Sequence, residues 1–443
     1  MLLVVCWSAA FGQEEGFCQS ERFKRAHAGY CIIDIETGAE IGSQNGEEFF
    51  VPASLQKIAM SVAALAILGK EHRFTTRLEY QGNIDAEGVL HGDIWIQGGG
   101  DPTLSLDVIS EWASAIRQKG IRKVDGKILV DASYFETALA SPFWFFEDLG
   151  NYFGAGACGL SINKNMYKIT FQPGANEGDP ATILKTDPPL PDLVAHNEVT
   201  TGPAGSGDRV YVFGMEYSPV QFYRGTVPID QPSLTIRAAM PDPPRFCAAS
   251  LCNQIEATQG IGRSKCYEKT ELLSQKESPA LEKILEEMNL YSVNLHAEHL
   301  LKTIGNGSLK EGAKILESFL NNLGIPAIVR DGSGLARTNM LTPRGFATLL
   351  REIRKNPLYQ SLYATFPQPG REGSLKAFLP LQGAQLRAKT GRMGQIGNLG
   401  GYLILPSGKE YAFCLFCNNY NGPLSDIDEE THRFLNHVIV NFN

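Results

Sequence analysis

The sequence lacks any run of lysine and arginine, and it lacks an apolar stretch long enough to cross a bilayer as a helix. Its formal net charge is -8, with no basic patch. Nucleic acid is therefore not expected as a partner, because phosphate binding requires clustered positive charge. A hydrophobic content of 43% and a charged content of 20% are typical of a globular protein.

Patterns for metals and nucleotides are also missing. There is no His-x-x-x-His and no paired set of Cys-x-x-Cys blocks, so a zinc site is not expected. Gly98-Gly99-Gly100-Asp101-Pro102 forms a glycine-rich loop, but no strand–GxGxxG–helix pattern surrounds it, and a nucleotide site is rejected. We expect neither a metal nor a cofactor.

The first twelve residues form an apolar run that ends in Ala10-Phe11-Gly12, which resembles a small-x-small cleavage site. A basic start is missing, but the segment otherwise resembles the end of a secretory signal. We therefore expect export to the periplasm or cell envelope, with the chain either soluble or peripherally associated with the membrane.

Nine cysteines are present, and removal of Cys6 with the signal segment would leave eight. An even number in an exported chain suggests disulfides. Three of them cluster in a loop-like stretch and are the best candidates: Cys247, Cys252 and Cys266. Cys414 and Cys417 lie on opposite faces of a strand-like run, so these two are not expected to pair with each other.

Ser54-Leu55-Gln56-Lys57 opens a long apolar run that ends before Gly69. The run predicts a buried helix beginning at about Ser54, with the serine near the positive end of the helix dipole. Lys57 would project from the same face one turn later. A lysine in an apolar wall near another cation has a lowered pKa and can take the proton of a serine hydroxyl. Ser54 and Lys57 are therefore a candidate nucleophile and base.

This pattern is weak alone, because Ser161-Ile162-Asn163-Lys164 fits it equally well. The alternative for Ser54 is a helix N-cap followed by a solvated lysine.

The predicted elements place a long insertion inside one domain. Apolar patterns predict strands at 29–35, after the turn at 37–38 to about 42, and at 73–80, 89–97, 127–131, 399–405 and 410–417. They predict helices at 107–119, 278–304, 309–323, 343–354 and 426–441. We expect an α/β (α+β) fold in which both chain ends build one antiparallel sheet with helices packed on it. This domain is placed at 22–75 plus 266–443, and a mostly β insertion of two subdomains at 76–265.

Two further motifs follow in the chain, Ser292-Val293-Asn294 and Lys389-Thr390-Gly391. Together with Ser54-x-x-Lys57, in this order, they resemble the motifs of penicillin-binding proteins and serine β-lactamases. Five more stretches narrow the resemblance to one branch: His72-Arg73-Phe74-Thr75-Thr76, Gly100-Asp101-Pro102-Thr103-Leu104, Asp331-Gly332-Ser333-Gly334-Leu335, Gly373-Ser374-Leu375 and Ala388-Lys389-Thr390-Gly391. That branch is the class C low-molecular-mass penicillin-binding proteins, the D-alanyl-D-alanine carboxypeptidase/endopeptidase family, whose members carry a large insertion after the first motif.

The resemblance implies a penicillin-recognising transpeptidase-like fold and assigns roles to the motif residues. Ser54 would attack the carbonyl of a D-Ala-D-Ala peptide or a β-lactam, and Lys57 would take its proton. Ser292 would relay a proton to the leaving amine. Asn294 would position the substrate amide and Lys57, and Lys389 would add positive charge that keeps Lys57 neutral. Thr390 would bind the substrate carboxylate, and Gly391 would let the substrate backbone lie against its strand. The oxyanion would lie between the backbone N–H groups of Ser54 and Arg392.

The aromatic stretch at 141–154 contains Trp144-Phe145-Phe146-Glu147-Asp148, which is similar to a Trp-containing acidic stretch in the family's insertion. The resemblance implies that Asp148 meets the amino group of the substrate's diamino acid. The alternative is a buried aromatic cluster beside two solvated acids.

Two positions depart from the family's pattern. Val293 replaces a frequent aspartate, which should cost little because that residue does not act. Arg392 replaces the usual serine or threonine after Lys-Thr-Gly. Its side chain would either help to hold an anionic substrate end or narrow the cleft, so it affects rate and β-lactam affinity more than reaction class.

The expected substrates are peptidoglycan stem peptides, cut by carboxypeptidase or endopeptidase action, with β-lactams as covalent inhibitors. Two alternatives stay open. A serine β-lactamase would need a base for fast deacylation, and no glutamate is identified for that role. A non-catalytic peptidoglycan-binding homologue would not need the motif residues, all of which are retained.

Overall fold

The computed structural model describes residues 16–190, 192–266 and 269–442, so the predicted signal segment at 1–12 lies outside the described residues. The chain divides into two compact units. The first contains the chain up to Glu71 together with Leu281–Gly305 and Lys310–Asn443. The second contains His72–Ala280 and Asn306–Leu309.

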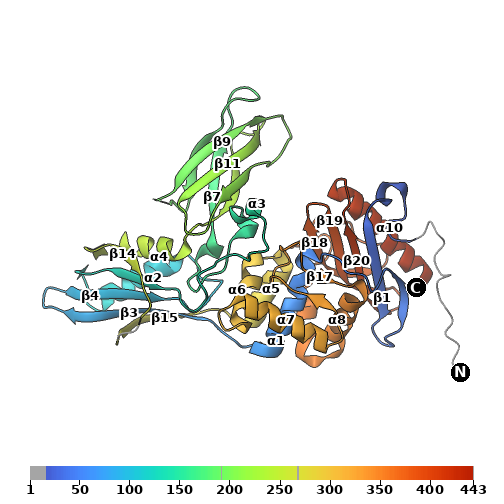
Figure 1. Cartoon of the computed structure of the whole chain (residues 1–443), viewed down its shortest axis with the longest axis horizontal. Helices are drawn as coiled ribbons and strands as arrows, with labels where there is room; N and C mark the ends of the chain where they lie inside the picture. Colours follow the sequence, from blue (N-terminus) through green and yellow to red (C-terminus); the bar gives the residue numbers. More distant parts are fainter. Residues whose placement is uncertain (1–15, 191, 267–268, 443) are drawn as a thin grey trace. The chain divides into compact units, whose positions relative to one another are not determined.

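The first unit is built on a five-stranded antiparallel sheet with the strand order β18-β19-β20-β1-β2 (Figure 1). Its strands are β1 (His27–Asp34), β2 (Glu40–Gln44), β18 (Gln385–Met393), β19 (Ile396–Ile404) and β20 (Glu410–Asn418). β1 pairs with β20 along its whole length, with Cys31 opposite Cys414. The two ends of the sequence therefore share one sheet, as the sequence predicts.

Successive side chains of β1 alternate between two helical layers. Tyr30 contacts Phe434 of α10 (Leu424–Phe442), with ring centroids 4.8 Å apart. On the other face, Cys31 packs with Ala347 of α8 (Pro343–Lys355). The predicted apolar face of the last helix is confirmed, since its residues pack against the sheet: Ile427, Phe434, Leu435, Val438, Ile439 and, partly buried, Phe442. Within the described part of the chain, no helix combines the length and the apolarity needed to span a membrane.

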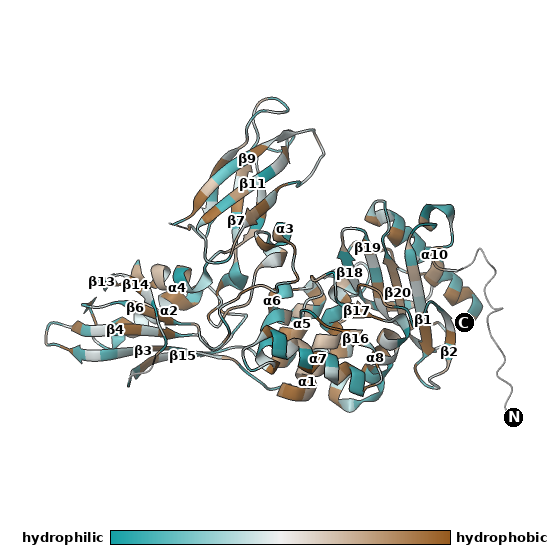
Figure 2. Cartoon of the chain, in the orientation of Figure 1, coloured by the Kyte–Doolittle hydropathy of each residue, from teal (hydrophilic) through white to brown (hydrophobic). Residues whose placement is uncertain are grey.

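Helix α1 (Gln56–Leu68) is buried on all sides over its first ten residues, which explains why its sequence is apolar all round (Figure 2). It packs against α5 (Leu281–Tyr291) and α6 (Asn294–Ile304). The remaining elements of this part of the chain are η1 (Glu21–Phe23), η2 (Ala53–Leu55), α7 (Leu309–Asn322), β16 (Ala327–Ile328), β17 (Met340–Leu341), η5 (Pro357–Tyr359) and α9 (Gln360–Ala364).

The helix predicted at 278–304 is interrupted at Ser292. This residue has a φ of +59°, in the left-handed region, so α5 ends before it and α6 begins two residues later. No glycine or proline marks the break. The interruption places Ser292 in a tight turn between two buried helices.

The second unit contains a seven-stranded sheet and two three-stranded sheets. Its strands are β3 (Thr75–Ile84), β4 (Val89–Gln97), β5 (Lys123–Val124), β6 (Ile128–Asp131), β7 (Met166–Gln172), β8 (Thr182–Asp187), β9 (Val194–Gly202), β10 (Tyr211–Gly214), β11 (Val220–Pro228), β12 (Leu234–Ala239), β13 (Glu256–Ala257), β14 (Ile261–Arg263) and β15 (Glu271–Glu277). Its helices are α2 (Asp107–Gln118), α3 (Phe146–Leu149), η3 (Tyr152–Gly154), η4 (Asn163–Asn165) and α4 (Pro243–Cys252). Figure 2 shows hydrophilic and hydrophobic residues mixed along β9 and β11.

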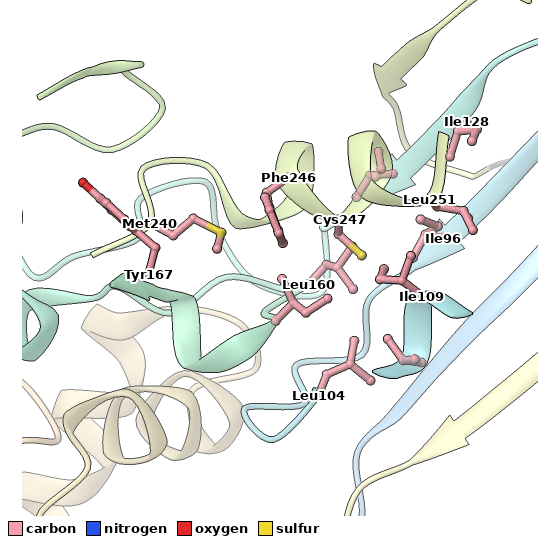
Figure 3. Close-up of a cluster of buried hydrophobic side chains, with 14 of the residues drawn as sticks. Ile96, Leu104, Ile109, Ile128, Leu160, Tyr167, Met240, Phe246, Cys247 and Leu251 are labelled. Atoms are coloured by element: carbon pink, nitrogen blue, oxygen red, sulfur yellow. The ribbon is translucent and has the colours of Figure 1, made fainter. Parts of the chain in front are cut away.

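A single apolar core joins the sheets of this unit. Figure 3 shows Phe246, Cys247 and Leu251 of α4 lying among side chains from β4, α2 and the loop that carries Leu160. The hydroxyls of Tyr167 and Tyr223 are 2.6 Å apart, so these buried tyrosines satisfy each other.

The boundary expected at 265 is wrong, because β15 pairs antiparallel with β3 and places Glu277 opposite Thr75. The second unit therefore extends to Ala280 and begins at His72. β15 is a largely exposed edge strand rich in charged residues, so it has no apolar run by which the sequence could reveal it.

The predicted disulfide among Cys247, Cys252 and Cys266 is not formed, since the structure holds these residues as thiols. Cys247 and Cys252 lie five residues apart on α4, which turns them to different faces of the helix. Cys247 is fully buried in the core beneath α4.

Candidate active site

The turn before α1 places Ser54 in the short 3-10 helix η2 rather than at a helix N-cap. Ala53, just before it, has a φ of +48° in the left-handed region. Gly334 supports this turn at close range, because a Cβ on that residue would lie 1.9 Å from the carbonyl oxygen of Ala53. The loop Asp331–Leu335 therefore packs directly against the backbone that carries Ser54.

Lys57 lies on the first turn of α1 and is fully buried. Its Nζ donates to Ser54 Oγ at 2.8 Å and to the carbonyl oxygen of Ser333 at 2.7 Å. Burial lowers the pKa of Lys57 to about 7, and the carboxylates of Asp331 and Glu298 partly oppose this shift. A neutral amine at this position can accept the hydroxyl proton of Ser54. The alternative reading of a solvated lysine is thereby wrong.

Ser292 and Lys389 come together from the α5–α6 turn and from β18. Lys389 Nζ donates to Ser292 Oγ and to the carbonyl oxygen of Thr390, both at 2.9 Å. Lys389 is also fully buried, and burial, followed by the positive charges of Lys57 and Arg392, lowers its pKa well below the usual range. Burial is the largest cause of the lowered pKa of Lys57, and the expected contribution of Lys389 stays a prediction.

Asn294 is the first residue of α6 and is half-buried. It follows Ser292 by two residues, so the turn that interrupts the helices holds both residues of this motif. Thr390 is buried in β18 between Lys389 and Gly391.

β18 approaches the Ser54 turn so closely that Gly391 has no room for a side chain. A Cβ on Gly391 would lie 2.4 Å from the carbonyl oxygen of Pro52. Asn398 of β19 donates from Nδ2 to that same oxygen at 3.1 Å and to the carbonyl oxygen of Val51 at 2.9 Å. The glycine therefore serves the packing of the site itself.

The side chain of Arg392 forms an ion pair with Asp428 of α10. Lys389 and Arg392 are three residues apart on one strand, so their side chains leave opposite faces. The guanidinium is thus directed toward α10, whereas the backbone N–H of Arg392 stays at the end of the Lys-Thr-Gly strand.

Sequence reasoning missed a set of buried polar residues behind Lys57. Glu298 Oε1 accepts from the backbone N–H of Ser333 at 2.8 Å and from that of Gly332 at 3.2 Å. Asp331 accepts from the N–H groups of Gly334 at 2.8 Å and Ala336 at 2.6 Å. Glu298 follows Asn294 by one helical turn on the buried side of α6, and a polar residue at that spacing was the available signal.

Two residues that the sequence indicated as possible site residues lie in the second unit. The alternative Ser-x-x-Lys serine, Ser161, is buried and accepts from Asn165 Nδ2 at 2.9 Å, which is a structural role. Asp148 lies on the short helix α3 and is half-buried. Its contact with substrate stays a prediction. Among the described residues, no group of three histidine, cysteine or acidic side chains is arranged to hold a metal.

The sequence matches a family model described as the D-Ala-D-Ala carboxypeptidase 3 (S13) family over residues 14–437. It is 28% identical over 429 residues to a D-alanyl-D-alanine carboxypeptidase of an Actinomadura species, covering 90% of this chain and 79% of the relative. It is 24% identical over 428 residues to the D-alanyl-D-alanine carboxypeptidase DacB of Haemophilus influenzae, covering 92% and 88%.

Among solved structures, the fold is similar to that of penicillin binding protein 4 from Haemophilus influenzae. The TM-score is 0.82 at 24% identity, over 94% of this chain and 97% of that chain. A structure of the same protein complexed with a β-lactam gives a TM-score of 0.76 at 23% identity, over 94% and 97%. The predicted fold class is confirmed by these matches.

Proposed function

We propose a reaction for this chain from the premise that it belongs to the D-Ala-D-Ala carboxypeptidase 3 (S13) family, among the class C low-molecular-mass penicillin-binding proteins. The chain is a serine-type peptidase that hydrolyses the D-Ala-D-Ala bond of peptidoglycan stem peptides, as a carboxypeptidase, an endopeptidase or both. The observation that supports this most is the 2.8 Å hydrogen bond between Lys57 and Ser54, with a buried lysine whose pKa is about 7.

Acylation begins when Ser54 Oγ passes its proton to the neutral amine of Lys57 and bonds to the substrate carbonyl carbon. The negative charge that develops on the carbonyl oxygen is stabilised by hydrogen bonds from the backbone N–H groups of Ser54 and Arg392. The C–N bond then breaks, and Ser292, held by Lys389 at 2.9 Å, relays the proton carried by Lys57 to the leaving amine, which returns Lys57 to its neutral form. Water attacks the resulting ester, which releases the shortened peptide and restores the Ser54 hydroxyl.

Substrate binding uses the residues around this centre. Thr390 and Lys389 bind the carboxylate of the terminal D-alanine, and Asn294 holds the substrate amide. Gly391 leaves the edge of β18 open to the substrate backbone. Asp148, from the inserted region, meets the amino group of the diamino acid.

The location and organisation follow from this substrate. Peptidoglycan is assembled outside the cytoplasmic membrane, so the chain acts after export to the periplasm or cell envelope, either soluble or peripherally associated with the membrane. The first unit is the catalytic domain, and the inserted unit contributes to substrate recognition. β-Lactams are covalent inhibitors, which the β-lactam complex of the related fold supports.

The experiment is intact mass spectrometry after incubation with a penicillin. We expect the wild-type chain to gain the mass of one drug molecule and Ser54→Ala to gain none. Ser161→Ala is the matched control, because it removes the serine of the other Ser-x-x-Lys sequence, and it should keep the adduct.

A folded wild-type chain that forms no adduct at any dose would contradict this mechanism and favour a non-catalytic binding role. Rapid loss of the adduct, with turnover of the drug, would instead indicate a β-lactamase.

A further inference from the structure

Two buried acids lie directly behind the base Lys57. Glu298 is only 1% exposed and Asp331 is fully buried. Both come from segments that the proposed reaction does not use: α6 after Asn294, and the loop Asp331–Leu335. Burying two carboxylates side by side costs folding free energy, so a compensating role is expected.

The acids fix two consecutive peptide groups of the loop. Glu298 accepts from the N–H of Ser333, and Asp331 accepts from the N–H of Gly334. The Gly334 N–H belongs to the same peptide group as the Ser333 carbonyl. That carbonyl oxygen accepts from Lys57 at 2.7 Å. Asp331 thus polarises the carbonyl that aims the lysine at Ser54, and Glu298 fixes the backbone that leads into it, through the N–H groups of Gly332 and Ser333.

Glu298 does more than accept from the loop backbone, because those hydrogen bonds use only one of its two carboxylate oxygens. Oε2 is buried and has no hydrogen-bond partner among the described residues. A purely structural acceptor needs only the oxygen that receives the two N–H groups, and a neutral amide would satisfy both. The carboxyl therefore supplies charge at a place where charge is costly.

We propose that Glu298 is a positioning residue for the reaction: through the Gly332–Ser333 backbone it holds Lys57 on Ser54, and its carboxylate charge sets the protonation state of Lys57. This inference rests on the proposed function, since it assigns a role beside the same nucleophile. The charged groups that face Lys57 are Glu298 from α6, Asp331 from the loop and Lys389 from β18.

The direction of the effect follows from the charges. Burial, and then the neighbouring Asp331, raises the pKa of Glu298 to about 7, so its charge changes in the same pH range as that of Lys57. A carboxylate stabilises the ammonium form of Lys57. Removal of that charge lowers the pKa of the lysine, and the amine then becomes neutral at a lower pH.

The test uses two substitutions with different consequences. Glu298→Gln keeps an oxygen for the two N–H groups but removes the charge. Glu298→Ala removes both. The second-order rate of acylation by a fluorescent penicillin is measured from pH 5 to pH 9 in the full-length chain.

We expect the acid limb of the Glu298→Gln profile to shift to lower pH, by about half a unit or more. We expect Glu298→Ala to lose at least about tenfold in acylation rate at every pH, because Lys57 loses its fixed direction. Glu430→Gln is the control, because it neutralises a buried acid of the same unit. Glu430 accepts from the backbone N–H of Cys18 and pairs with Arg433, so its substitution should leave the pH profile of acylation unchanged.

A second measurement is independent of activity. The titration of Lys57, followed by NMR through a ¹³C label on its Cε and assigned by its absence in Lys57→Met, should show a lower pKa in Glu298→Gln than in the wild type. An unchanged lysine pKa together with an unchanged acid limb would overturn the inference. A wild-type chain that forms no penicillin adduct would overturn the proposed function instead, while the NMR titration would still decide the role of Glu298.

Discussion

Lys57 is subject to opposing electrostatic effects. Loss of water around the ammonium lowers its pKa, whereas the carboxylates of Asp331 and Glu298 raise it. Without the carboxylates the amine would be neutral over a wider pH range, but it would also be a weaker base toward the Ser54 hydroxyl. A pKa near 7 gives both a substantial neutral fraction and useful basicity at neutral pH.

This balance predicts how the wild-type enzyme responds to pH. The base form is the neutral amine, so acylation should be near its maximum above pH 8 and should fall about tenfold for each pH unit well below 7. Stopped-flow measurement of penicillin acylation between pH 5 and pH 9 checks this, with circular dichroism at each pH to confirm that the chain stays folded. A flat rate down to pH 5 in a folded chain would show that Lys57 is not the base.

At the level of elements, the site depends on how closely β18 approaches the turn that carries Ser54. Gly391→Ala would place a methyl group 2.4 Å from the carbonyl oxygen of Pro52, so strand and turn must separate. We expect a loss of about 2 kcal/mol in the free energy of unfolding and a clear drop in acylation rate, because Lys389 moves with its strand. Chemical denaturation and the acylation assay measure the two effects.

Gly394→Ala is the control for this substitution. Gly394 lies three residues further on, and its Cβ would meet nothing closer than an Arg337 nitrogen at 3.5 Å. It should behave as the wild type. Equal stability of the two variants would mean that the approach of β18 to the turn is not tight.

The parts of the site that the sequence predicts are those whose chemistry is local or follows a known motif. Ser54 and Lys57 are one helical turn apart, so their pairing follows from periodicity. Ser292 and Lys389 were found only through the resemblance, since nothing in the spacing indicates that an α5–α6 turn and β18 meet.

Other features left little or no pattern in the sequence. The only signal for Glu298 was its spacing of one helical turn from Asn294, because it acts through backbone N–H groups, which carry no residue identity. The break at Ser292 depends on a positive φ without glycine, and β15 is an edge strand whose pairing with β3 is set by position rather than by apolar residues. The antiparallel sheet and the packing of α10 against it were predictable, because these strands and this helix contain long apolar runs.

At the scale of the whole molecule, the two units have separate apolar cores, one beneath α4 and one between the five-stranded sheet and α10. The insertion leaves and re-enters the first unit at adjacent points, since Glu282 N donates to the carbonyl oxygen of Lys70 at 3.2 Å. Replacement of residues 72–280 by a short glycine linker should therefore give a folded chain that still forms a penicillin adduct on Ser54.

The same shortened chain should hydrolyse a stem peptide containing a diamino acid less well than the full chain, because Asp148 is removed with the insertion. Asp148→Asn in the full-length chain is the matched control and should reproduce part of this loss. A shortened chain that is unfolded by circular dichroism would show that the first unit depends on the second.

The pairing of β1 with β20 sets the order in which a nascent chain can fold. The second unit is nearly contiguous in sequence, so it can form before the last part of the chain is available. β1 can pair early with β2, but its other edge must wait for β20, which ends at Asn418. Until then Ser54 has no Lys389 strand beside its turn. A hydrolase built in this way stays inert until almost its entire chain is available, because its nucleophile is completed only then.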